Sequence, residues 1–158
     1  MQASELSGIA GWVQQQRDLF AAYYEELREV KNVLSAFEAV KTMIDQEARV
    51  IAGYRQASSN LSADKHFSTS EVETMSGVLA GIAQKSADNL ARLNIVVTSL
   101  LTQMDDGARL RLIDETGSAI DKNYRDMADF SQQAYLLSAQ RAKDAGDLAT
   151  VKALYGIQ

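Results

Sequence analysis

One apolar seam runs through residues 5–58, ELSGIAGWVQQQRDLFAAYYEELREVKNVLSAFEAVKTMIDQEARVIAGYRQAS, and this stretch decides the fold. Its apolar residues recur three and four positions apart, without a proline. Such spacing keeps one stripe of a helix facing a partner, as in coiled coils and long bundles. The seam rows are Leu6, Val13, Phe20, Leu27, Leu34, Lys41 and Ala48, and Ile9, Gln16, Tyr23, Val30, Phe37, Ile44 and Ile51. The stretch is therefore predicted to form one long helix.

Charged side chains follow the other face of the same stretch, and we interpret this face as solvated. Its members are Arg17, Asp18, Glu25, Glu26, Arg28, Glu29, Lys31, Asp45, Glu47 and Arg49. An alternative to the continuous helix is a break near Lys31 to Ser35 that folds the N-terminal part back onto the rest of the chain.

The composition favours a single helical domain over residues 1–158. The chain is 46% hydrophobic and contains no proline, which costs about 3 kcal/mol inside a helix. The net charge is -5, with sixteen basic residues dispersed among twenty-one acidic ones, which argues against a nucleic-acid-binding surface. The absence of cysteine excludes a disulfide framework and a thiolate nucleophile.

Capping signals divide the remainder of the chain. A loop is expected from Gln56 to Ser70, where the apolar rhythm stops, and Ser68 with Glu71 forms a capping box for a helix over 69–104. Either Asp105 or Asp106 can cap a third helix over 107–145, which Gly146 would end, and a short helix follows over 148–155. The predicted fold is all-α: an elongated antiparallel three-helix bundle or coiled coil with a long first helix and a short C-terminal helix.

The three long helices are expected to differ in length, at roughly 80, 54 and 60 Å. Residues 5–20 would then extend beyond their neighbours and expose an apolar end, which soluble monomers rarely leave bare. We expect self-association or a partner there, through Leu6, Ile9, Trp12, Val13 and Phe20. If the first helix instead breaks and folds back, Trp12 belongs to the core.

Little in the sequence indicates catalysis. His66 is the only histidine, it has no evident nucleophile beside it, and a histidine in a loop is usually exposed. The nearest acidic group comprises Asp105, Asp106, Asp114 and Glu115, which we interpret as caps and solvated positions. We expect no enzymatic activity, no metal and no cofactor. The competing enzyme hypothesis, a carboxylate-bound metal in the bundle, predicts metal in the purified protein.

The N-terminus leaves the cellular location open. The first ten residues lack the basic start and the apolar run of a signal peptide. Met1 is either the native start or a methionine placed ahead of a mature chain whose export signal has been removed. The longest apolar block, residues 95–101, is far below the ~20 residues that cross a bilayer, so no membrane span is expected.

Residues 66–157 resemble the TraI-type small helical transfer proteins of conjugative transposons. The residues that carry the resemblance are His66-Phe67-Ser68 with Glu71, Gln103-Met104-Asp105-Asp106, Arg109-Leu110, Ile113-Asp114, Gln140-Arg141, Asp147 and Ala153-Leu154-Tyr155-Gly156. The first helix is similar to the family only in being helical and amphipathic.

The resemblance implies a non-enzymatic part of the cell-envelope apparatus, related to type IV secretion, that moves DNA between cells. Its partners would be other transfer-apparatus proteins or further copies of itself as a homo-oligomer, with no direct contact to nucleic acid. Family members usually carry an export signal, so the protein is expected in the periplasm if that signal has been removed and in the cytoplasm otherwise. The alternative is a cytoplasmic helical adaptor or sensor module that dimerises through the seam.

Overall fold

The computed structural model describes residues 8, 10–19, 21, 31–102 and 104–157. Within these residues the regular elements are all helices: α2 (Lys31–Ala63), α3 (Thr69–Leu101), α4 (Asp106–Asp144) and α5 (Leu148–Leu154). A helical segment over residues 10–19 precedes them. The predicted all-α class is confirmed for this part of the chain.

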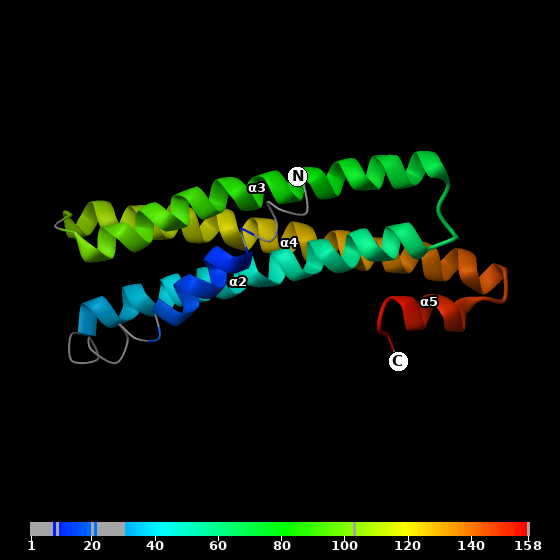
Figure 1. The fold of residues 1–158 in the computed structure, drawn as a ribbon, viewed down its shortest axis with the longest axis horizontal. Helices are drawn as coiled ribbons and strands as arrows, with labels where there is room; N and C mark the ends of the chain where they lie inside the picture. The colour runs from blue at the N-terminus through cyan, green and yellow to red at the C-terminus, as the bar shows by residue number, and fades with distance from the viewer. Residues whose placement is uncertain (1–7, 9, 20, 22–30, 103, 158) are drawn as a thin grey trace.

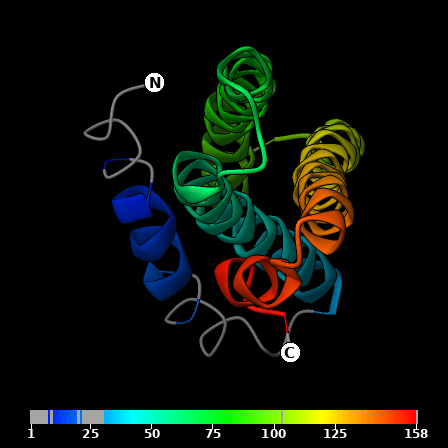
Figure 2. The ribbon, with the colours of Figure 1, turned by 90° about the vertical axis from the view of Figure 1, so that its right-hand side faces the viewer.

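α2, α3 and α4 lie lengthwise beside one another, and each packs against the other two (Figure 1). Seen end-on, they surround a common interior, while the segment 10–19 lies beside α2 and α5 packs against α4 (Figure 2). The interior holds two apolar clusters. The first contains Val40, Ile44, Leu93 and Ile120, and the second contains Val50, Leu61, Leu79 and Met127. Each such side chain stabilises the fold by about 1.5–3 kcal/mol on burial.

The single rod expected over residues 5–58 is not observed. Arg17 Nε lies 3.1 Å from Asp45 Oδ1. In a straight helix those two residues would be about 42 Å apart along the axis, at 1.5 Å per residue. The segment 10–19 therefore folds back along α2, as in the alternative prediction of a broken helix. The periodic apolar residues are divided between two helices and do not form one continuous stripe.

α2 also ends later than the sequence indicated, because residues expected in a loop continue the helix to Ala63. Ser62 Oγ donates to the carbonyl oxygen of Ser58 at 3.0 Å, so this serine bonds within the helix and does not compete with it. Leu61 is buried in the second apolar cluster. Burial of the last turn thus outweighs its weak helix propensity, and the loop shrinks to residues 64–68.

The caps expected from the sequence are present at the starts of α3 and α4. Ser68 and Glu71 form both halves of the capping box, and α3 begins at Thr69. Asp105 caps α4 by accepting a hydrogen bond from the amide of Ala108 at 2.9 Å. These caps satisfy amide groups that helix starts leave without partners.

The ends of α4 and α5 share one geometry. After α4, the amide of Asp147 donates to Ala142 O at 2.8 Å, and Gly146 has φ 74°. After α5, the amide of Ile157 donates to Lys152 O at 2.9 Å, and Gly156 has φ 68°. Both are Schellman endings, in which glycine supplies the left-handed residue. They turn the chain so that Asp147 and Ile157 lie against the rest of the fold.

Candidate functional site

The structure places two of the five predicted interaction residues in the interior. Val13 is 3% exposed in the first apolar cluster, and Trp12 is partly buried against the same cluster. The exposed end expected for these two residues is therefore not observed. Leu6, Ile9 and Phe20 lie outside the described residues, so their role as contacts stays a prediction.

A dense polar group forms instead where the loop after α2 meets the turn between α4 and α5. We call it the Asp64 cluster, and it comprises Asp64, His66, Glu71, Arg141, Asp147 and Tyr155. The Asp64 side chain is fully buried. Its carboxylate accepts hydrogen bonds from the amide of His66 at 3.0 Å and from the Tyr155 hydroxyl at 3.0 Å, and lies 2.9 Å from Nδ1 of His66.

The protonation of Asp64 reflects a competition between burial and hydrogen bonding. Burial alone would raise the pKa of this carboxyl. Hydrogen bonds from His66 and Tyr155 outweigh burial and lower the pKa below its ordinary 3.8, because each donor favours the charged form. Burial and the adjacent carboxylate in turn raise the pKa of Tyr155. Asp64 is thus a buried anion held by neighbouring donors.

His66 lies between two carboxylates that are far apart in the sequence. Its Nδ1 faces Asp64, and its Nε2 lies 3.4 Å from Oδ2 of Asp147. Only 13% of its side chain is exposed, so the expectation of an exposed loop histidine is wrong. The ring joins the α2–α3 loop to the start of α5.

Arg141 of α4 completes the cluster. Its guanidinium donates to the carbonyl oxygen of His66 at 2.7 Å and to both carboxylate oxygens of Glu71 at 2.6 and 3.0 Å. It also lies over the Phe67 ring, 5.7 Å from the centroid. These bonds, with those of Ser68, lower the pKa of Glu71 to about 2. Arg141 entered the sequence analysis only through the resemblance, and nothing in the sequence indicated these contacts.

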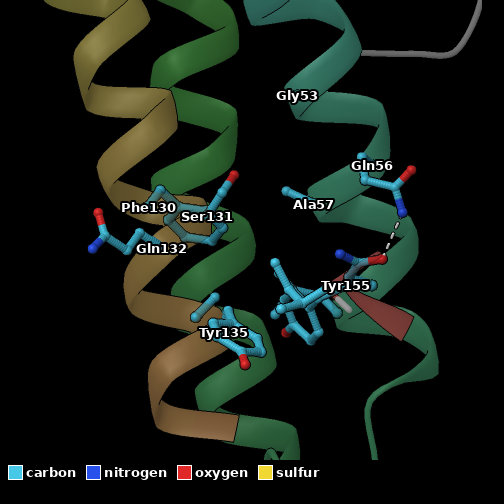
Figure 3. Close-up of a pocket in the computed structure, with 12 residues that line it drawn as sticks. Gly53, Gln56, Ala57, Phe130, Ser131, Gln132, Tyr135 and Tyr155 are labelled. Carbon is cyan, nitrogen blue, oxygen red and sulfur yellow. Dashed lines mark hydrogen bonds between the residues drawn. The ribbon is translucent and has the colours of Figure 1, made fainter. Parts of the chain in front are cut away.

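A pocket of about 320 Å³ lies beside the cluster, between α2, α4 and the end of α5 (Figure 3). Gly53, Gln56 and Ala57 line it from α2, and Phe130 and Tyr135 line it from α4. Tyr155 belongs to both features: its ring lines the pocket, and its hydroxyl bonds to Asp64.

A second buried carboxylate lies midway along α2, between the two apolar clusters. Glu47 has no exposed surface, which corrects the interpretation of this position as part of a solvated face. Ser86 Oγ donates to its Oε2 at 2.5 Å and Asn89 Nδ2 donates to its Oε1 at 3.1 Å. Burial raises the pKa of Glu47 from 4.5 to about 7 against the opposing effect of these two bonds. Because α3 packs against α2, this face is covered and not solvated.

Two of the four acidic residues considered for metal binding have other contacts. Asp105 caps α4, and Asp106 pairs with Arg109 at 2.8 Å. The described residues contain no group of three or more His, Cys, Asp or Glu side chains arranged to hold a metal ion. The contacts of the Asp64 cluster join the α2–α3 loop, α4 and the start of α5.

Among the helices of residues 31–102 and 104–157, none combines the length and apolar character needed to cross a bilayer. The chain matches no protein-family model, no curated protein and no solved structure.

Proposed function

We propose that the protein is a non-enzymatic structural or interaction component of a conjugative DNA-transfer apparatus, related to type IV secretion, in the cell envelope. The supporting observation is the Asp64 cluster. His66, Glu71, Arg141, Asp147 and Tyr155 all carry the family resemblance, and they contact one another or Asp64 although they come from two distant parts of the chain. Residues that share one structural feature support a family relationship better than scattered helix caps would.

We further propose that the chain works as an elongated antiparallel three-helix bundle that docks through its surface. The turn between α3 and α4 exposes Leu101, Met104 and Leu110, each with 37–56% of its surface accessible. Neighbouring exposed apolar side chains are typical of interaction sites. Met104 and Leu110 also belong to the resemblance. The partner in this proposal is another transfer-apparatus protein, with a second copy of the chain as the alternative.

The proposal is tested by deleting the gene in its native host and measuring conjugative transfer of the element that carries it. We expect transfer to be lost while element copy number stays the same, and to be restored by the wild-type gene. Complementation with Leu110→Asp should fail, whereas Leu136→Asp, an equally exposed leucine elsewhere on α4, should restore transfer. Undiminished transfer in the deletion strain would overturn the proposal.

The alternative function is a cytoplasmic adaptor that dimerises through the seam. Such a dimer would require the core of the protein to open. Phe37, Ile44 and Ile51 of that seam are buried in the protein's own core, so a dimer that uses them would first have to open it. Cell fractionation separates the two proposals, because the transfer component belongs to the envelope fraction and the adaptor to the cytoplasm.

A further inference from the structure

The pocket beside the Asp64 cluster has the composition of a ligand site. Its most buried members are the apolar residues Ala57, Leu61 and Ala134 together with the neutral amide of Asn60, each less than 9% exposed. The rings of Phe130, Tyr135 and Tyr155 add aromatic surface (Figure 3). The volume of about 320 Å³ lies within the range of small-molecule sites.

The polar groups of the pocket are all neutral. None of its lining residues is Asp, Glu, Lys or Arg, so a charged ligand would lose its hydration without gaining an opposite charge. The amides of Gln56 and Asn60 lie 2.8 Å apart and are already paired. The Tyr135 hydroxyl makes no hydrogen bond to the part of the chain that the structure describes. It is a donor available to a ligand.

Contacts of the C-terminal lining residues fix one side of the pocket. Tyr155 is fixed by its bond to Asp64, and its ring stands 5.6 Å from that of Tyr135 at an interplanar angle of 56°. The Schellman ending at Gly156 directs Ile157 to the pocket rim. Because these residues of the chain itself cover one side, a small molecule fits the space better than a partner helix, which would have to displace them.

We propose that this pocket binds an uncharged, mainly aromatic small molecule with one polar atom directed at the Tyr135 hydroxyl. Such a ligand would contact α2, α4 and the end of α5 together, and would therefore stabilise the docking of α5. This role is separate from the docking function proposed above, because the pocket lies at the opposite end of α4 from Leu110.

The test uses the full chain and N-phenyl-1-naphthylamine, an uncharged dye that fluoresces in apolar sites, with anionic 1-anilinonaphthalene-8-sulfonate for comparison. We expect the neutral dye to bind with one-to-one stoichiometry and the anionic dye to bind at least about tenfold more weakly. Ser131→Phe, which fills the pocket, should weaken binding of the neutral dye by about tenfold or more. Gln133→Phe places the same ring on an exposed position of α4 outside the pocket and should leave binding unchanged.

A second pair of variants covers the case in which Ser131→Phe does not fold. Ile157→Asp puts a charge at the exposed rim and should also weaken binding of the neutral dye, whereas Leu136→Asp should not. Equal binding of the two dyes, or equal loss in pocket and control variants, would place the dye on the general apolar surface and overturn the proposal.

Discussion

Two buried carboxylates, Glu47 in α2 and Asp64 in the loop after it, have pKa values that are shifted in opposite directions. Glu47 receives hydrogen bonds from two neutral side chains, and burial raises its pKa to about 7. Asp64 is less completely buried, and donors from His66 and Tyr155 lower its pKa. Burial penalises both charges, and the depth of burial together with the number of donors decides the direction of each pKa shift. Asp64 thus holds elements together as an anion, whereas Glu47 is most stable when protonated.

The largest effect is expected from Asp64→Ala. The substitution leaves the Tyr155 hydroxyl and the His66 amide without their acceptor, and we expect the free energy of unfolding to fall by about 3 to 4 kcal/mol. Urea denaturation at pH 7 measures this loss. Asp129→Ala, on the exposed face of α4, should change stability by less than about 0.5 kcal/mol. Similar losses in both variants would remove the special role of Asp64.

The raised pKa of Glu47 predicts that the free energy of unfolding declines as pH rises. In the unfolded chain its carboxyl loses the proton near pH 4.5, whereas in the fold it keeps it to about pH 7. The folded state therefore binds more protons between these values, and the free energy of unfolding should fall by about 3 kcal/mol as pH rises across the window. No charged group contributes to this shift.

Glu47→Gln isolates that effect. The amide keeps the shape of the protonated carboxyl, so the decline between pH 4.5 and 7 should disappear and stability at pH 8 should rise by about 2 kcal/mol. Glu38→Gln, exposed on the same helix, should keep the wild-type slope. Asp64 acts in the opposite sense: its contribution is present above pH 3.8 and is lost as pH falls through its lowered value.

The smallest effect concerns the turn that brings Asp147 to the Asp64 cluster. Gly146→Ala should cost about 1 kcal/mol, because φ is 74° there although nothing lies within 4 Å of an added Cβ. Gly77→Ala has the same open space inside a helix without a positive φ and should stabilise by about 0.5–1 kcal/mol. The melting temperatures of the two variants measure these changes. A Gly146→Ala variant more stable than the wild type would contradict the account of the turn.

The sequence predicted the helix caps and helix ends that depend on contacts between residues close together in the chain. The capping box of Ser68 and Glu71 spans four residues, and Gly146 lies two residues after Asp144, the last residue of α4, so both were identifiable from spacing alone. The fold-back of residues 10–19 was not identifiable, because an apolar seam looks the same whether one helix or two carry it. The contact between Arg17 and Asp45 and the burial of Val13 in the first apolar cluster decide between them.

The candidate site depends on distant pairs and was largely missed. Tyr155 and Asp64 are 91 positions apart, and Arg141 and Glu71 are 70 apart. No period or motif relates such positions, so each residue was interpreted by its local setting as a cap, a loop residue or a solvated charge. Glu47 was assigned to a solvated face for the same reason, because periodicity alone did not indicate that α3 covers it.

The most direct test of the contrast between the two carboxylates is a titration of both groups in one sample by carboxyl ¹³C NMR, with Glu47→Gln and Asp64→Asn used for assignment. Glu47 should titrate near pH 7, and Asp64 should remain charged to below its ordinary 3.8. Ordinary values of about 4.5 and 3.8 for the two groups in the folded protein would contradict it.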